Sequence, residues 1–207
     1  DRLVFVDEKG HFFGEEYTLV ACADYILSKT SGATVSNMSS TRALLDVTLT
    51  HAGHYSASAV GEVNVVKEMK AVNAVIGGEG NGGVIYPPLH YGRDALVGVV
   101  IFLSLLVERK VSVSKLRASY PNYFMSKNKI ILNEGIDVDD VMNTMAKRYV
   151  SEKISIIDGV KIDFEKEWVH LRKSNTESII RVYTEAMSKE KASALAQRFV
   201  SEINSLL

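Results

Sequence analysis

The chain has 207 residues, 46% of them hydrophobic, and its 24 basic and 25 acidic side chains leave a net charge of −1. This composition is enough for one large core or two small ones, and the usual size of a domain favours two. A nearly neutral chain whose basic residues are scattered lacks the field that gathers nucleic acid or an anionic membrane, so we expect neither as a partner.

Two further features of the sequence indicate the cellular compartment. The single cysteine, Cys22, excludes an internal disulfide framework and is typical of a reducing cytoplasm, where we expect the protein. Cys22 falls in a helical apolar pattern, which predicts a small core residue. The most apolar run, 95–107, is shorter than the ~20 residues that span a bilayer, so it predicts a buried helix and no membrane association.

The first part of the chain alternates strands with helices. The predicted elements, in order, are a strand, turn and strand over 2–13, a helix over 15–28, a strand over 34–38, a helix capped by Ser39 or Ser40 that ends at Gly53, a strand over 55–60, a helix over 61–72, strands over 74–76 and 84–86, and a helix over 95–109. This alternation predicts an α/β domain with a mixed, mostly parallel sheet.

The pattern changes near residue 112. The predicted elements are a short helix over 113–119, a strand over 123–132, a helix over 137–149, a hairpin of strands 153–157 and 160–164 across Asp158-Gly159, strands over 169–171 and 179–184, and a helix over 189–206. Tight turns between consecutive strands predict an α+β domain with an antiparallel sheet flanked by helices. The boundary between the domains should fall between about residues 110 and 122.

A glycine-rich segment follows the strand at 74–76. Residues 77–83 contain five glycines, so the backbone either takes positive φ angles or lets another group approach closely. Ligands bind at loops that leave the carboxyl ends of strands in such sheets, and Glu79 and Asn81 are suited to read hydroxyls. A flexible connector is the alternative. His90 and Arg93 could face the same cleft, whereas Asp94 is expected to cap the following helix.

A second polar segment lies between the apolar runs at 168–171 and 179–184. Arg172 and Arg181 can give forked N–H bonds to a phosphate, and Ser174, Asn175 and Thr176 favour a turn that adds more donors. On residue types alone a solvated hairpin is favoured over an oxyanion site.

Several of these segments together resemble the α-D-phosphohexomutases, and the resemblance covers nearly the whole chain. Residues 172–178 with Arg181 are similar to the phosphate loop R-x-S-G-T-E-P followed by Arg, with Asn175 in place of Gly and Ser178 in place of Pro. Residues 78–83 resemble the sugar loop G-E-x-S-G-H. The family Glu then falls on Glu79 and the Ser on Asn81.

Other parts of the resemblance are weaker. The family His of the sugar loop falls on Gly83, so that its role is missing or supplied elsewhere, with His90 as a candidate. Residues 58–62 are similar to the turn T-P-V-G-D. Asp1-Arg2-Leu3 is similar to the end of the metal loop D-x-D-x-D-R, which implies that Asp1 is the last of three Mg²⁺-binding aspartates and Arg2 the arginine beside the reacting phosphoryl group.

The resemblance implies a domain organisation. The family has four domains, so residues 1–13 would be the tail of the metal-binding second domain, 14–112 the third domain and 118–207 the fourth. We therefore expect a fragment whose N-terminal domains are missing and which binds Mg²⁺ mostly through residues upstream of it.

The resemblance also implies an activity. Phosphohexomutases interconvert hexose 6-phosphate and hexose 1-phosphate through a phosphoserine and a bisphosphate intermediate, and we expect a phosphoglucosamine mutase. The alternatives are a phosphomannomutase or phosphoglucomutase, or a non-enzymatic phosphosugar-binding protein made of two domains. The phosphoserine segment is not in this sequence, so these 207 residues alone should be inactive.

Overall fold

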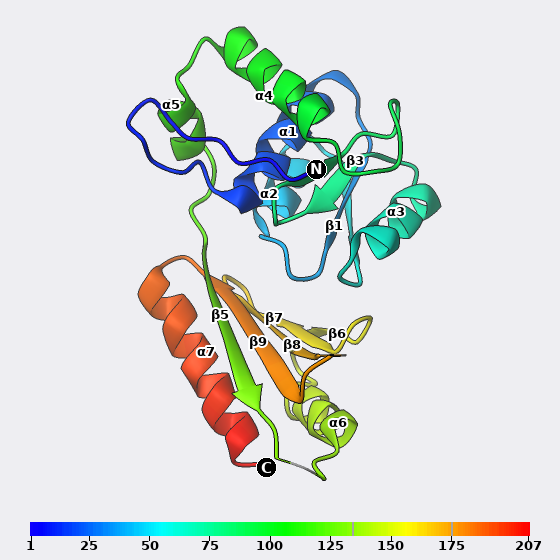
Figure 1. Cartoon of the computed structure of the whole chain (residues 1–207), viewed down its shortest axis with the longest axis vertical. Coiled ribbons are helices and arrows are strands. Elements are labelled where there is room, and N and C mark those ends of the chain that lie inside the picture. Colours follow the sequence, from blue (N-terminus) through cyan, green and yellow to red (C-terminus); the bar gives the residue numbers. More distant parts are fainter. Residues whose placement is uncertain (134, 175) are drawn as a thin grey trace. The chain divides into compact units, whose positions relative to one another are not determined.

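The computed structural model describes residues 1–133, 135–174 and 176–207. They form two compact units, Asp1–Asn122 and Tyr123–Leu207, drawn in Figure 1. The predicted fold class is confirmed in both units, because a mostly parallel sheet with helices is followed by an antiparallel sheet with helices.

The first unit contains a four-stranded sheet of order β2-β1-β3-β4. Its strands are β1 (Ala33–Asn37), β2 (His54–Ser58), β3 (Ala74–Glu79) and β4 (Gly83–Ile85). β1 pairs in parallel with both β2 and β3, whereas β4 runs antiparallel to β3. The carboxyl ends of the three parallel strands therefore lie at one edge of the sheet.

Helices cover both faces of this sheet (Figure 1). The helices of this unit are α1 (Glu15–Lys29), α2 (Ala43–Thr50), α3 (Glu62–Ala71), α4 (Ala95–Arg109) and α5 (Val113–Ala118), of which α1 to α4 contact strands. Successive residues of a strand point to opposite faces: a Cβ added at Gly77 would meet Met69 of α3, whereas one at Gly78 would lie 3.3 Å from Leu19 of α1. Cys22 of α1 is buried, as expected of a core residue, and burial raises the pKa of its thiol to about 12.

Residues 1–13 follow the predicted strand, turn and strand in outline, with the turn at 8–10 and isolated bridges in place of full strands. Only single bridges form, between Arg2 and Gly83 and between Val6 and Phe12. The Leu3 N–H donates to the Gly82 carbonyl at 2.9 Å, and the ring of Phe5 stacks on Phe102 with 3.7 Å between centroids. The segment is thus fixed by the glycine-rich loop and by α4, which brings Asp1 and Arg2 to that loop.

The predicted cap of the second helix is wrong. α2 begins at Ala43 with Arg42 at the N-cap, and Thr41 Oγ1, rather than a serine, accepts from the Ala43 N–H at 3.2 Å. The Ser40 hydroxyl instead donates to Asn37 Oδ1 at 3.1 Å and accepts from the Gly80 N–H at 2.9 Å. Ser40 is therefore used to hold the glycine-rich loop.

α4 begins as predicted, because Asp94 Oδ1 accepts from the backbone N–H groups of Leu96 and Val97. It is buried on one side only: Ile101, Phe102 and Leu105 are buried, whereas Leu96 is 79% and Val107 76% exposed. No helix among the described residues is long and apolar enough to cross a membrane.

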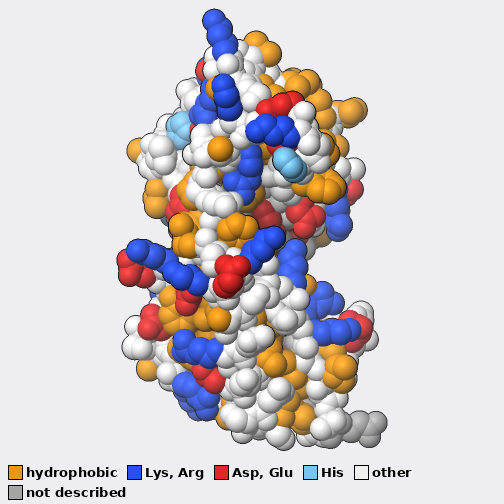
Figure 2. Space-filling view, turned by 90° about the vertical axis from the view of Figure 1, so that its left-hand side faces the viewer, with side chains coloured by type: hydrophobic (Ala, Val, Ile, Leu, Met, Phe, Trp, Pro, Cys, Tyr) orange, Lys and Arg blue, Asp and Glu red, His pale blue; other side chains and the backbone are white. Residues whose placement is uncertain are grey.

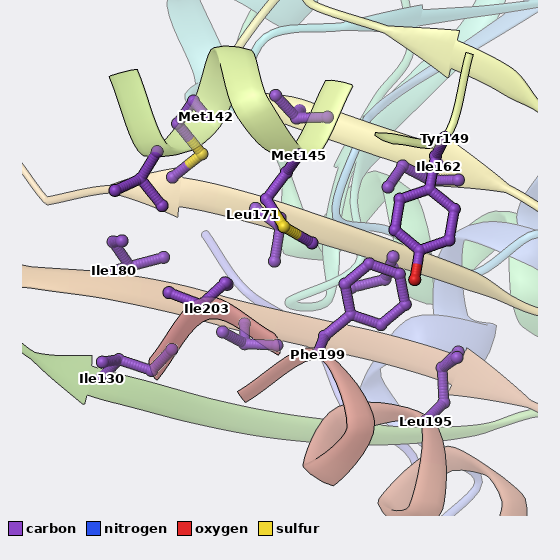
Figure 3. Close-up of a cluster of buried hydrophobic side chains, with 14 of the residues drawn as sticks. Ile130, Met142, Met145, Tyr149, Ile162, Leu171, Ile180, Leu195, Phe199 and Ile203 are labelled. Atoms are coloured by element: carbon purple, nitrogen blue, oxygen red, sulfur yellow. The ribbon is translucent and has the colours of Figure 1, made fainter. Parts of the chain in front are cut away.

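The second unit contains a five-stranded antiparallel sheet of order β5-β9-β8-β7-β6. Its elements are β5 (Phe124–Ile131), α6 (Val138–Arg148), β6 (Lys153–Ser155), β7 (Val160–Asp163), β8 (Trp168–Lys173), β9 (Ile179–Ala186) and α7 (Lys189–Asn204). One face of the sheet packs on both helices. Figure 3 shows this core, which includes Ile130, Leu171 and Ile180 of the sheet, Met145 of α6 and Phe199 of α7.

The connection between β6 and β7 is wider than the predicted two-residue turn. The last pair of these strands is Ser155 with Lys161, so five residues, 156–160, lie between them. The Asp158 carbonyl accepts from His170 of β8 and its carboxylate lies beside Arg172, which turns this residue toward β8. Contacts with β8 therefore decide the shape of this turn.

Charged side chains of both signs are mixed on the surface. On the face drawn in Figure 2, Lys and Arg side chains are interspersed with Asp and Glu side chains over both units. Any binding site for an anion is therefore a local arrangement on this face, in line with the near-zero net charge of the chain.

Candidate functional site

Three buried polar residues end the parallel strands of the first unit. Asn37 ends β1, Ser58 ends β2 and Glu79 ends β3, and all three are at most 6% exposed. Asn37 and Ser58 are direct partners in the parallel pairing. Since ligands bind outside the carboxyl ends of the strands in such sheets, this edge is the candidate ligand site of the unit.

Glu79 is held by hydrogen bonds from two neighbouring strand ends. Its Oε1 accepts from Asn37 Nδ2 at 2.9 Å and from the Gly61 N–H at 3.2 Å, and its Oε2 accepts from Asn81 Nδ2 at 3.4 Å. Asn81 Oδ1 accepts in turn from the Gly83 N–H at 3.3 Å. The two side chains predicted to read hydroxyls are thus together and oriented, and each has acceptor capacity left for a ligand.

Two of the loop glycines are required by close contacts. A Cβ at Gly80 would overlap the carboxylate of Glu16, and one at Gly82, where φ is +83°, would overlap the Leu3 carbonyl. Glu16 Oε2 also accepts from the Thr41 N–H at 2.9 Å. The loop is therefore fixed by contacts on both sides, which disfavours the alternative of a flexible connector.

Arg93 joins the loop to three carboxylates. Its Nη2 lies 2.7 Å from Asp1 Oδ2, its Nε 2.9 Å from Glu62 Oε2, and its Nη1 3.5 Å from Glu79 Oε2. Three negative charges against one positive charge leave a surplus of negative charge. Such a set disfavours a phosphate and favours hydroxyl donors or an ammonium group.

His90 and Arg2 make different contacts. His90 Nε2 lies 3.1 Å from Asp94 Oδ2, so its side chain joins the cap of α4. The Val97 N–H and His90 hydrogen bonds lower the pKa of the Asp94 carboxyl. Arg2 is exposed and reaches the loop through its backbone bridge to Gly83. The structure therefore brings Arg93, Glu79, Asn81 and Asp1 into one set of contacts.

The predicted phosphate loop connects β8 to β9 in the second unit. The Ser174 N–H donates to the Ile179 carbonyl at 3.1 Å, and the Thr176 N–H donates to Ser174 Oγ at 3.4 Å. Arg172 and Arg181 are direct partners across the two strands, so their side chains leave the same face of the sheet. Asn175 lies outside the described residues.

Arg172 is positioned from the turn after β6. Its Nε lies 2.8 Å from Asp158 Oδ2, but the buried Nε–H makes no hydrogen bond, so the contact is an ion pair with poor alignment. His170 Nε2 lies 2.6 Å from the Asp158 carbonyl, which can only accept. Burial lowers the pKa of His170 to about 4. His170 is thus a neutral donor at neutral pH and fixes the turn that carries the partner of Arg172.

Sequence reasoning missed three residues of the candidate ligand site in the first unit, Asn37, Ser40 and Glu62. Asn37 carries one signal, since it is a polar residue at the carboxyl end of a predicted strand. Glu62 lies in the segment 58–62, which is similar to a family turn. Its contact with Arg93 connects segments 31 residues apart, and no spacing within the chain predicts it.

Both units match known domain families. Residues 14–123 match the family model described as phosphoglucomutase/phosphomannomutase, alpha/beta/alpha domain III, and residues 127–202 match the one described as phosphoglucomutase/phosphomannomutase, C-terminal domain. The chain belongs to the phosphoglucomutase/phosphomannomutase family. The resemblance inferred from the sequence motifs is thereby confirmed.

Relatives of this chain carry two kinds of name. It is 33% identical over 195 residues to a "Phosphoglucomutase/phosphomannomutase" of Thermococcus kodakarensis, covering 93% of this chain and 42% of the relative. It is 30% identical over 208 residues to a "Probable phosphoglucosamine mutase" of Methanopyrus kandleri, covering 97% of this chain and 45% of the relative. The chain thus spans about half the length of the curated relatives it matches.

Solved structures share the fold. A phosphoglucomutase/phosphomannomutase family protein of Burkholderia thailandensis superposes with a TM-score of 0.81 at 22% identity, covering 99% of this chain and 44% of that one. An N-acetylphosphoglucosamine mutase of Aspergillus fumigatus, solved in complex with GlcNAc-6P and magnesium, superposes with a TM-score of 0.66 at 14% identity, covering 96% and 48%. Within residues 1–133, 135–174 and 176–207 of this chain, no group of three His, Cys, Asp or Glu is placed to hold a metal ion.

Proposed function

We propose that this chain is the substrate-binding C-terminal half of a phosphohexomutase that interconverts hexose 6-phosphate and hexose 1-phosphate. Family membership supports the reaction. The observation that carries the proposal is the division of charge between the units: carboxylates dominate around Arg93 in the first, whereas Arg172 and Arg181 lie side by side in the second. A hexose phosphate presents hydroxyls and a dianion, and each unit suits one of them.

The residues of this chain bind and orient the sugar in this proposal. In the family reaction, a phosphoserine outside these 207 residues gives its phosphate to the sugar, the bisphosphate turns round, and the serine takes the other phosphate back. Hydroxyls are read by Glu79, Asn81, His90 and Arg93. The phosphate that is not transferred is bound by Arg172, Ser174, Asn175, Thr176 and Arg181.

The proposal includes Mg²⁺, which neutralises charge on the transferring phosphoryl group when it is bound. Asp1 is its proposed ligand from this chain, and Arg2 is proposed to lie beside that phosphoryl group. The described residues do not form a magnesium site by themselves, since Asp1 has Arg93 at 2.7 Å and no metal-binding group of three side chains occurs among them. We therefore assign most of the ligands to residues outside this chain.

Glucosamine phosphate is the proposed substrate. Glu62 and Glu79 face the single guanidinium of Arg93, so a negative charge remains even before Asp1 is counted. An ammonium group on the sugar would neutralise that charge, whereas the hydroxyl of glucose or mannose would not. Relatives named phosphoglucosamine mutase fit this choice, and the relatives named phosphoglucomutase/phosphomannomutase represent the alternative.

Kinetics of the full-length protein test the substrate. We expect the highest kcat/KM with glucosamine 6-phosphate among the 6-phosphates of glucosamine, mannose and glucose, and equal or higher values with the other two would reject the choice. The purified 207-residue chain should show no turnover with any of them, and mutase activity of that chain would contradict the assignment of the phosphoserine to another part of the protein.

A non-enzymatic phosphosugar-binding protein is the competing class. It predicts that the full-length protein binds hexose phosphates but never becomes phosphorylated and never releases the isomeric product. Detection of a phosphoserine and of hexose 1-phosphate would exclude this class. A cytoplasmic location is part of the proposal and follows from the sugar-phosphate substrate.

A further inference from the structure

A row of three cations crosses the sheet of the second unit. Lys129 of β5 is the direct partner of Arg181 on β9, and Arg181 is the direct partner of Arg172 on β8. Directly opposite residues of an antiparallel sheet have their side chains on the same face. The next residues along these strands, Ile130, Ile180 and Leu171, are buried in the helix-covered core, so the row lies on the other face.

Repulsion within this row lowers the stability of the sheet unless an anion binds there. Like charges directly opposite each other destabilise a sheet. Arg172 Nε lies 2.8 Å from Asp158 Oδ2. Arg181 Nη2 lies 3.8 Å from Glu177 Oε2, and the side chains of Arg181 and Glu177 are each more than a third exposed. Within the described part of the chain, no carboxylate forms an ion pair with Lys129. Positive charge is therefore only partly balanced in the free protein.

A hollow of about 350 Å³ lies beside two members of the row, Lys129 and Arg181. Lys127 and Lys129 line it from β5, Arg181 and Tyr183 line it from β9, and Glu177 lines it from the connecting loop. The hollow is therefore rimmed by cations from two strands, and the one acidic residue among its described lining residues, Glu177, lies next to Arg181.

We propose that Lys129 is a third cationic ligand of the sugar phosphate, which lies in this hollow beside Arg181. Glu177 is the internal counterion that the phosphate displaces. Arginine supplies forked hydrogen bonds to the phosphate oxygens, and the lysine supplies a point charge from the neighbouring strand. This inference rests on the proposed function of the second unit and adds a residue that lies 43 positions before the phosphate loop.

A structural role for Lys129 is the alternative. β5 is an edge strand of the sheet, and lysines on edge strands prevent pairing with other chains. That role predicts self-association when Lys129 is replaced and no change in affinity for phosphate. The two roles therefore differ in what they predict for one substitution.

Titration calorimetry with inorganic phosphate on the 207-residue chain tests the inference. Ionic strength is matched with chloride, because exposed charges are screened by salt. We expect Lys129→Gln to weaken phosphate binding about tenfold, as for the loss of a charged hydrogen bond, and Glu177→Gln to strengthen it about threefold. Lys166→Gln is the control, since Lys166 is exposed in the turn at the other end of β8 and should leave the affinity unchanged.

Each outcome decides the question. Weaker binding by Lys129→Gln with an unchanged Lys166→Gln supports the third ligand. If Lys129→Gln binds phosphate as the wild type does, with or without self-association in size-exclusion chromatography, the inference is wrong and the proposed phosphate loop stands. If the wild type itself binds no phosphate, both the inference and the proposed role of the loop are overturned.

Discussion

Glu62 and Arg93 are joined twice: Glu62 Oε2 accepts from Arg93 Nε at 2.9 Å, and Glu62 Oε1 accepts from the Arg93 backbone N–H at 3.1 Å. Glu62 begins α3 and Arg93 lies just before α4, so the pair ties two helix starts together. Because both the backbone and the side chain of Arg93 are held, its terminal nitrogens are left to Asp1 and Glu79.

The first prediction concerns Glu62→Gln in the full-length protein. The amide keeps the size of the side chain but removes the charge that orients Arg93, so we expect kcat/KM to fall about tenfold, the effect of a charge-assisted hydrogen bond. Steady-state kinetics with glucosamine 6-phosphate measure it. Glu108→Gln is the matched control, because Glu108 pairs with Lys29 on the surface of the same unit. Equal kinetics for the two variants would reject a role of Glu62 in the site.

The second prediction concerns Arg181→Ala in the full-length protein. Loss of this guanidinium leaves the substrate phosphate without one of its proposed partners, so KM should rise about 10- to 100-fold or turnover should be lost. Arg148→Ala is the control, since Arg148 is an exposed arginine on α6 in the same unit. An unchanged KM for Arg181→Ala would remove Arg181 from the phosphate site.

The third prediction concerns the pH dependence of the second unit. The pKa of His170 is about 4 in the folded protein and about 6.5 in an unfolded chain, so the unfolded state binds more protons between these values. The contribution of neutral His170 is complete above pH 6.5 and is lost as the pH falls toward 4. We expect a loss of about 3 kcal/mol over this range.

Urea unfolding followed by Trp168 fluorescence measures this effect. Trp168 is the only tryptophan and is buried in the second unit, so its signal reports that unit. His170→Gln should flatten the dependence between pH 6.5 and 4, whereas His11→Gln, which removes an exposed histidine, should retain it. A dependence in His170→Gln as steep as in the wild type would show that other groups cause it.

The fourth prediction concerns Asp24, which is buried in the first unit with three partners. Its Oδ1 lies 2.8 Å from His51 Nε2, and its Oδ2 lies 2.7 Å from the Tyr120 hydroxyl and 2.8 Å from Arg109 Nη2. Asp24→Asn leaves these partners without the charge, so we expect a loss of about 2–3 kcal/mol in the stability of this unit. Thermal unfolding by circular dichroism measures it. A midpoint unchanged from wild type would show that the network contributes little.

The fold of this chain is largely contained in local patterns. α4 begins where Asp94 supplies a cap and ends where its apolar pattern ends, and both signals lie within 16 residues. Patterns of this kind also predicted the order of strands and helices in both units. The cap of α2 and the turn at Asp158 were wrong because Ser40 and Asp158 bond to Gly80 and His170, which are distant in the chain.

The residues of the candidate sites also fall into two groups, those that a sequence motif indicates and those that only the fold brings together. Arg172 and Arg181 fall in one short segment with a recognisable motif, so the sequence points to both. Lys129 lies beside Arg181 through strand pairing, and Asn37 contacts Glu79 through a hydrogen bond, and no motif in the sequence shows either relationship. Which residues face each other across a sheet depends on register, and the spacing of residues within one strand does not contain it.

The contacts of residues 1–5 have a mechanical consequence. The Leu3 N–H donates to the Gly82 carbonyl, and Asp1 forms an ion pair with Arg93. The ring of Phe5 is stacked on Phe102 of α4. Displacement of residues 1–5 would therefore move the glycine-rich loop and the guanidinium of Arg93 together. Movement of the chain around Asp1 would change the position of the proposed sugar-binding loop without any substitution in the loop itself.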